Sequence, residues 1–130
     1  MLDLMVDSAV RISIYRDIID QLVSETRMYS ALAKRAEANE PFPVESEQSA
    51  FNRLLSSLTQ EQRTLLSEIL LQERHSAIHD TLAALTWWID SRGIGLTVHG
   101  QPMPVDLSGM GLHGDYVGRA DGWEWPSDEA

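Results

Sequence analysis

Glycine is distributed so unevenly in this 130-residue chain that it divides the sequence at Gly93. The first 92 residues contain no glycine, and all eight glycines lie between Gly93 and Gly122. Glycine disfavours helix interiors and supports tight turns. We therefore expect a mainly α protein that forms a single domain over residues 1–130. The expected parts are a helical body over 1–92, a hairpin and covering segment over 93–126, and a frayed tail over 127–130.

Three to four helices are expected, most of them before Gly93. Apolar residues at steps of three and four predict a first helix from Asp3 or Ser8 to Ala38, which the prolines of NEPFP must end. A short helix is expected over 46–57. The sequence Thr59-Gln60-Glu61-Gln62 is a capping box, in which the end residues bond each other's backbone N–H. It predicts a long helix that runs to Ser91, with Gly93 as its stop.

The segment after Gly93 combines a hairpin pattern with closely spaced glycines. Residues 96–105 alternate apolar and polar side chains about a central turn, with prolines on the second strand. From Asp106 onward the glycines recur every two to five residues, and Gly109-Met110-Gly111 precedes no obvious helix. We expect an irregular Gly/Trp-rich wrap. Its large side chains would pack on the helices: Leu112, Tyr116, Val117, Trp123 and Trp125.

The chain is acidic, with a formal net charge of −10, and has no cysteine. Nucleic acid and anionic membranes both attract clustered Lys and Arg, so we expect neither as a ligand. No apolar run approaches the roughly 20 residues of a membrane span, and the acidic start does not fit a secretory signal. We expect a cytoplasmic protein, whose charge serves solubility or attracts a basic protein partner. A thiol nucleophile or thiolate zinc site is excluded.

On a helical wheel, the long helix has one broad apolar face with two acids at its edge. Glu73 and Asp80 lie seven residues apart, hence on the same side of the helix. A carboxylate in such a place needs a partner, and Arg119 is the only Lys or Arg after Arg92. The face is expected to pack in the core, Trp88 included: Leu66, Ile69, Leu70, Ala77, Thr81, Ala84, Leu85 and Trp88.

The opposite face of the long helix carries the spacing H-x-x-x-H at His75 and His79. On a helix this spacing aims two imidazoles the same way, as a metal pair requires, and Glu68 is a candidate third ligand. Zinc proteases have a Glu directly after the first His, whereas this chain has Ser76. Such pairs are common on polar helix faces, and a solvated or hydrogen-bonded face is the preferred explanation. We therefore expect no metal and no cofactor, with Glu68, His75 and His79 as the metal candidates.

Two His-Asp couples favour a different site, between the long helix and the C-terminal segment. They are His79 with Asp80 and His113 with Asp115, and Arg119 follows nearby in the sequence. These five residues are the candidate catalytic groups of a metal-dependent or acid–base enzyme. No nucleophile elbow and no phosphate loop accompanies them. The competing interpretation is that they bond backbone groups and fasten the wrap.

All four tryptophans lie after residue 86, which indicates an aromatic cluster. The candidate ligand-binding residues are Trp87, Tyr116, Trp123 and Trp125. Aromatic pairs also stabilise packing, by about 0.5–1.5 kcal/mol beyond simple burial. Packing is therefore the competing interpretation for these residues.

Two stretches, ERHSAIHDTLAALTWWID and GMGLHGDYVGRADGWEWP, together resemble a small bacterial protein family of unknown function. The resemblance covers about residues 73–126. It implies a bacterial cytoplasmic protein, and it brings no activity, cofactor or catalytic residue with it.

The leading hypothesis for function is a non-enzymatic protein-binding or regulatory module. The acidic surface and the lack of familiar catalytic motifs favour it, and an immunity-like inhibitor of a basic toxin is one concrete version. The length of the long helix leaves a homodimer open. The alternatives are the enzyme described above and a small-molecule binder that uses Trp87, Trp123 and Trp125.

Overall fold

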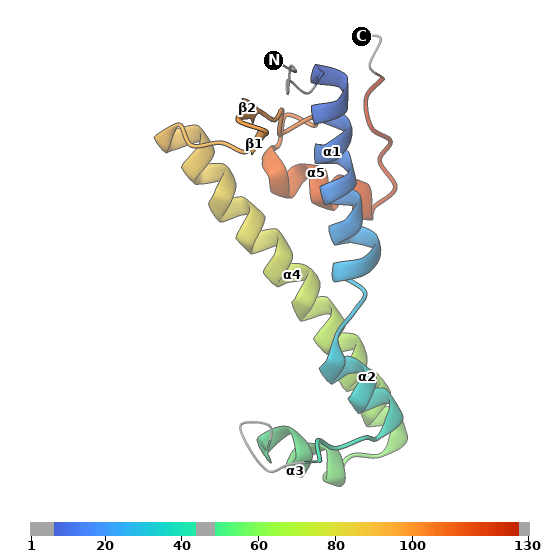
Figure 1. The fold of residues 1–130 in the computed structure, drawn as a ribbon. Helices are drawn as coiled ribbons and strands as arrows, with labels where there is room; N and C mark the ends of the chain where they lie inside the picture. The colour runs from blue at the N-terminus through green and yellow to red at the C-terminus, as the bar shows by residue number, and fades with distance from the viewer. Residues whose placement is uncertain (1–6, 44–48, 128–130) are drawn as a thin grey trace. The chain divides into compact units, whose positions relative to one another are not determined.

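The computed structural model describes residues 7–43 and 49–127, and Figure 1 shows the order of the elements along the chain. It is mainly helical with a small two-stranded sheet, as the sequence predicts. The chain forms two compact units, Met1–Thr26 with Ala77–Ala130 (unit 1) and Arg27–Ser76 (unit 2). The single domain over 1–130 stays a prediction, and the tail expected at 127–130 falls almost wholly outside the described residues.

The predicted first helix is divided into three pieces, so its expected run to Ala38 is wrong. Helix α1 spans Ser8–Gln21, a π-helical turn η1 spans Leu22–Thr26, and α2 spans Ala31–Ala38. Ser30 is extended, and its hydroxyl accepts a hydrogen bond from the Ala33 N–H at 3.1 Å. The Ser30 hydroxyl thereby satisfies one of the backbone N–H groups that are free at the start of α2. This N-cap favours a new helix at Ala31 over continuation of the preceding one. The alternative start at Asp3 lies outside the described residues.

The long helix α4 spans Gln60–Arg92, and both of its predicted ends are confirmed. Thr59 and Gln62 bond each other's backbone N–H at 2.9 and 3.2 Å, as a capping box requires. Gly93 adopts a φ of +67°, and its N–H donates to the Ile89 carbonyl at 3.2 Å. A left-handed residue after the last turn ends the helix, and glycine adopts this conformation at the lowest steric cost.

The predicted apolar face of α4 is wrong, including Trp88 as a core residue. Ile69 is 59% exposed and Trp88 is 49% exposed, whereas the buried residue of α4 is Leu82. Ile78 and Ile89 are partly buried against the same core as Leu82. Apolar residues occur on several sides of this helix, so periodicity alone did not determine which side the rest of the chain would cover.

The predicted hairpin is confirmed, although its paired part is short. Strands β1 (Thr97–Val98) and β2 (Gln101–Pro102) are antiparallel, with Thr97 opposite Pro102. The two residues between them both have positive φ, +49° at His99 and +78° at Gly100. Two left-handed central residues are typical of a tight hairpin turn whose twist matches that of the strands.

Residues 111–120 form helix α5, Gly111–Ala120, so the prediction that no helix follows Gly109-Met110-Gly111 is wrong. The Gly111 N–H donates to Asp106 Oδ1 at 2.6 Å, and the Leu112 N–H donates to Thr86 Oγ1 at 3.0 Å. Two of the free donors at the start of the helix are therefore satisfied by side chains. Residues on either side of α5, 106–110 and 121–127, are irregular, as expected of the wrap.

The core of unit 1 joins α1, α4 and α5 with the segment after the hairpin. Helix α5 lies beside α1 in Figure 1. The wrap residues Leu112 and Tyr116 are buried in this core, and Val117 and Trp125 pack against it, as predicted. The buried members are Tyr15, Ile19, Leu82, Met103, Leu112 and Tyr116.

Unit 2 contains α2, α3 (Ser49–Ser57) and the first half of α4. The predicted break at residues 39–43 is confirmed: Asn39 is left-handed and ends α2. Asn52 then fixes the following loop, because its amide both accepts from and donates to the backbone of Phe42, at 2.8 and 3.0 Å. Leu55 of α3 is buried. The start expected for this helix, at residue 46, lies outside the described residues.

Candidate functional site

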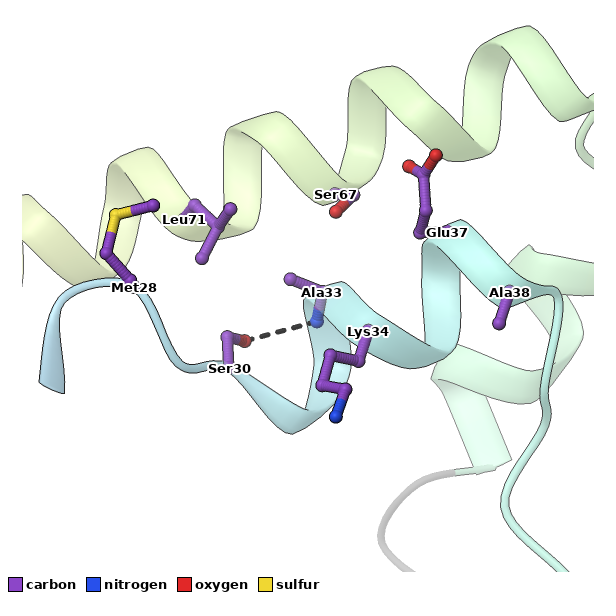
Figure 2. Close-up of a pocket in the computed structure, with 8 residues that line it drawn as sticks. All are labelled: Met28, Ser30, Ala33, Lys34, Glu37, Ala38, Ser67 and Leu71. Atoms are coloured by element: carbon purple, nitrogen blue, oxygen red, sulfur yellow. Dashed lines mark hydrogen bonds between the residues drawn. The ribbon is translucent and has the colours of Figure 1, made fainter. Parts of the chain in front are cut away.

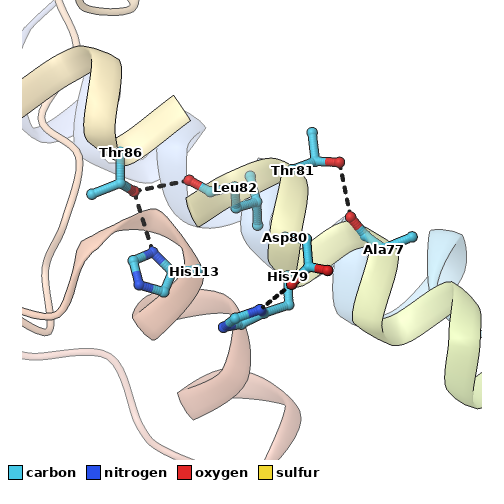
Figure 3. Close-up of polar contacts among 7 residues, drawn as sticks. All are labelled: Ala77, His79, Asp80, Thr81, Leu82, Thr86 and His113. Atoms are coloured by element: carbon cyan, nitrogen blue, oxygen red, sulfur yellow. Dashed lines mark hydrogen bonds and ion pairs between the residues drawn. The ribbon is translucent and has the colours of Figure 1, made fainter. Parts of the chain in front are cut away.

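His79, Asp80 and His113, three of the five candidate catalytic residues, lie together where α5 meets α4. The rings of His79 and His113 are edge to face, with centroids 5.3 Å apart. His79 Nδ1 lies 3.0 Å from Asp80 Oδ1, and His113 Nδ1 lies 3.4 Å from Thr86 Oγ1 (Figure 3). The His79 side chain is 39% exposed and that of Asp80 is 79% exposed. This cluster is therefore open to solvent.

Thr86 is the residue of this cluster that the sequence did not single out. Its hydroxyl donates to the Leu82 carbonyl at 2.9 Å and accepts the Leu112 N–H at 3.0 Å. It thus joins α4 to the first turn of α5 and positions His113 one residue further on. No spacing in the sequence marks Thr86, because its role depends on a helix that the glycine pattern concealed.

Asp115, the fourth candidate, is buried among donors instead of facing the histidines. It accepts hydrogen bonds from the Tyr15 hydroxyl and from the backbone N–H groups of Leu107 and Ser108, at 2.8 and 2.7 Å for the latter two. Burial raises the pKa of Tyr15 well above its ordinary value, and the hydrogen bond to Asp115 raises it further. Through these contacts Asp115 holds α5, the loop before it and α1 together. This agrees with the alternative interpretation, in which these polar residues fasten the C-terminal segment.

Arg119, the fifth candidate, does not pair with Asp80. Its Nε donates to Asp20 Oδ1 at 2.7 Å, so the partner expected from the long helix is replaced by one from α1. The other carboxylate oxygen of Asp20 accepts from Trp125 Nε1 at 3.0 Å. Glu73, the other acid for which Arg119 was the expected partner, is exposed. Asp20 was one of several acids on the first helix, and nothing in the sequence distinguished it.

The candidate ligand-binding aromatics divide into separate groups in unit 1. Trp123 and Trp125 are edge to face at 5.3 Å, and Trp125 also meets Tyr15 of the core at 6.1 Å. Tyr116 is fully buried. Trp87 instead contacts Trp88, with centroids 5.0 Å apart, and is 51% exposed.

The metal candidates Glu68, His75 and His79 do not form a ligand set. Over residues 7–43 and 49–127, no group of three or more His, Asp, Glu or Cys side chains is placed to hold a metal ion. His79 is instead paired with His113, a residue the H-x-x-x-H spacing did not involve.

Two hollows in the described part of the chain are lined by residues other than the candidate catalytic and ligand-binding ones. Unit 2 has a groove of about 330 Å³ between α2 and α4, with Ala33 and Leu71 among its apolar lining and Lys34 and Glu37 at its margin (Figure 2). Unit 1 has a hollow of about 450 Å³ beside the start of α1. The residues that line this second hollow are Asp7, Ser8, Ala9, Ile12, Arg16, Leu107, Pro126 and Ser127.

Several exposed apolar side chains of unit 1 lie close together in the sequence where α4 ends. Between residues 85 and 96, five large apolar side chains are more than a third exposed. We call this set the tryptophan surface: Leu85, Trp87, Trp88, Ile94 and Leu96. Within the described part of the chain, no helix has the length and apolar character needed to cross a membrane.

Comparison with known proteins assigns the chain to a family. The model of a family of unknown function, DUF6547, matches residues 8–127, and the chain belongs to this family. The match therefore includes the first helices as well as the two stretches between 73 and 126 that carried the resemblance. No curated protein matches the chain, and no solved structure matches it.

Proposed function

We propose that this protein is a non-enzymatic protein-binding module that holds a basic partner through the tryptophan surface. The observation that carries the proposal is the half-exposure of two adjacent tryptophans, Trp87 at 51% and Trp88 at 49%. Tryptophan is among the residues most enriched where alanine substitution costs the most binding energy. The two tryptophans also contact each other, with ring centroids 5.0 Å apart, and contiguous exposed apolar side chains mark interaction sites more often than scattered ones do.

The charge of unit 1 supports a basic partner. Its described residues include ten Asp or Glu and four Arg, with no Lys. Asp90 is exposed on the same helix as the two tryptophans. Acidic groups around an apolar centre attract a positively charged partner and accelerate its association at low salt. An immunity-like inhibitor of a basic toxin is one concrete form of such a module.

An enzyme is the second hypothesis, and the juxtaposition of His79, Asp80 and His113 is the observation that favours it. Two of the groups it needs, Asp115 and Arg119, are already engaged with Tyr15 and Asp20. Trp87 and Trp88 contact each other, and the Arg92 guanidinium lies over the Trp87 ring at 5.9 Å, yet both tryptophans remain about half exposed. Protein binding is therefore the better supported function.

The test compares Trp87→Ala/Trp88→Ala with a control that removes two apolar side chains of similar fractional exposure from the other unit, Leu65→Ala/Ile69→Ala. Each immobilised chain is incubated with source-cell lysate, and retained proteins are quantified by mass spectrometry. The basic protein most enriched on wild type is then purified for affinity measurement. Loss of the two tryptophans should weaken its binding at least roughly thirtyfold, as expected for about 2 kcal/mol. The control should bind as wild type does.

Two outcomes would overturn the proposal. If the tryptophan variant retains the same proteins with the same affinity, the surface does not bind the partner. If sedimentation shows that wild type is a dimer and the tryptophan variant a monomer, the surface joins two copies of this chain instead. That result would support the homodimer and remove the argument for a basic partner.

A further inference from the structure

The paired histidines of unit 1 have their Nδ1 atoms engaged in a way that determines where each ring carries its proton. His79 Nδ1 lies 3.0 Å from Asp80 Oδ1. A carboxylate can only accept, so Nδ1 must be the donor. In the neutral ring this places the proton on Nδ1 and leaves the lone pair on Nε2.

The same reasoning applies to His113 through Thr86. The Thr86 hydroxyl has one proton, which it donates to the Leu82 carbonyl at 2.9 Å. At 3.4 Å from His113 Nδ1 it can therefore only accept. His113 also carries its neutral-ring proton on Nδ1, and its Nε2 has a free lone pair.

We propose that His79 and His113 bind a divalent transition-metal ion such as Zn²⁺ through their Nε2 atoms. Figure 3 shows the two rings together at the junction of α4 and α5, and their centroids are 5.3 Å apart. Neutral imidazole nitrogen is a preferred ligand of zinc. The site is independent of the protein-binding function proposed above, because it uses none of the residues of the tryptophan surface.

Asp80 and Thr86 have the positions of outer-sphere groups in this site. A metal-bound His commonly donates its other N–H to a carboxylate or another acceptor, which orients the ring and makes it a better ligand. His79 has this arrangement with Asp80, and His113 has it with Thr86. With two protein ligands, the remaining zinc positions would be filled by water or by a small ligand. Such a site binds zinc exchangeably and leaves positions open.

The test is calorimetric titration of the metal-free, untagged chain with Zn²⁺. Wild type should bind one ion per chain, and His79→Ala or His113→Ala should weaken binding by at least about tenfold. Asp80→Ala should weaken it by roughly tenfold to a hundredfold, the usual effect of an outer-sphere change. His75→Ala and His99→Asn are the controls. His99 has a positive φ, which Asn tolerates, and both controls should bind as wild type does.

A second measurement covers the case in which His113→Ala fails to fold. Long-range ¹H–¹⁵N correlation on the metal-free wild type should show Nδ1 protonated in both rings, and Zn²⁺ should shift both Nε2 resonances. Protonated Nε2 atoms in neutral rings would overturn the proposal. So would the absence of saturable zinc binding, unchanged binding in His79→Ala, or an equal loss in His75→Ala, which would indicate the H-x-x-x-H pair.

Discussion

At the scale of single residues, Asp115 links three parts of unit 1, one of which is far away in the sequence. It lies on α5, and its partners are Tyr15 on α1 and the loop at Leu107 and Ser108. A buried carboxylate needs such donors, because an unpaired one is costly. The sequence identified Asp115 as a candidate site residue, but its partner Tyr15 is 100 residues away in the chain. No local pattern reveals a contact of that range.

The contribution of Tyr15 to this network can be tested by comparing the stability of wild type and Tyr15→Phe at alkaline pH. The Tyr15 pKa is raised above its ordinary value of 10.0 by burial and by Asp115, so the folded state holds the proton more tightly than the unfolded state. Its contribution to stability is present in full below pH 10 and falls above it, by about 1.4 kcal/mol per pH unit. Between pH 9 and 11, wild type should therefore lose about 1.4 kcal/mol more unfolding free energy than Tyr15→Phe, measured by urea denaturation.

Tyr29→Phe is the matched control, because the Tyr29 side chain is exposed. It should retain the full alkaline loss of wild type. At neutral pH Tyr15→Phe should itself be less stable by about 1–3 kcal/mol, since Asp115 loses a donor and the Asp106 N–H loses its acceptor. Equal alkaline losses in wild type and Tyr15→Phe would show that Tyr15 is not the group responsible.

At the scale of elements, α5 is a helix that forms in spite of its high glycine content. Three glycines of this helix lie where a side chain would meet a neighbour. A Cβ on Gly111 would be 2.7 Å from Thr86 Cγ2, one on Gly114 would be 2.4 Å from Met110 Cβ, and one on Gly118 would be 3.3 Å from Trp123. The glycines therefore allow close contact, and that packing offsets their low helix propensity. Helix propensity depends on the local sequence, whereas these close contacts depend on the tertiary structure.

A comparison of Gly111→Ala with Gly109→Ala distinguishes the energetic cost of a steric clash from that of backbone strain. Both glycines have positive φ, +85° and +83°, so both substitutions introduce similar backbone strain. Only at Gly111 does the added methyl group meet another residue, since nothing lies within 4 Å of the position at Gly109. We expect Gly109→Ala to lose about 1 kcal/mol of unfolding free energy and Gly111→Ala at least about 2 kcal/mol, by urea denaturation. Equal losses would mean that α5 and α4 separate without cost.

The elements that the sequence did predict are those with local signals. The capping box and Gly93 gave both ends of α4, and alternation with a turn gave the hairpin. The covered side of α4 was not predictable, because Ile69 and Leu82 are equally apolar in the sequence. Likewise, His113 lies on α5, a helix that the sequence did not predict. The residues of the candidate site could therefore be named from the sequence, but the contact between His79 and His113 could not be predicted.

At the scale of the whole molecule, the two units share the continuous helix α4. Unit 2 has few buried apolar side chains among its described residues, namely Ala33, Ala36 and Leu55, whereas the core of unit 1 includes several large ones. A unit as small as residues 27–76 is marginal by itself. Helix formation is cooperative along the chain, so fraying of either half of α4 affects the other. The units should therefore unfold as the single domain predicted from the sequence.

Leu55→Ala in unit 2 and Leu112→Ala in unit 1 test this cooperativity. Each removes a buried side chain and should lower the unfolding free energy by about 2–5 kcal/mol. If the chain is one cooperative domain, either substitution lowers hydrogen-exchange protection in both units by similar amounts, measured by mass spectrometry in mild denaturant. Loss confined to the substituted unit would show two domains joined by a helix. In that case α4 between the units would act as a linker, and its stability would depend on its own sequence.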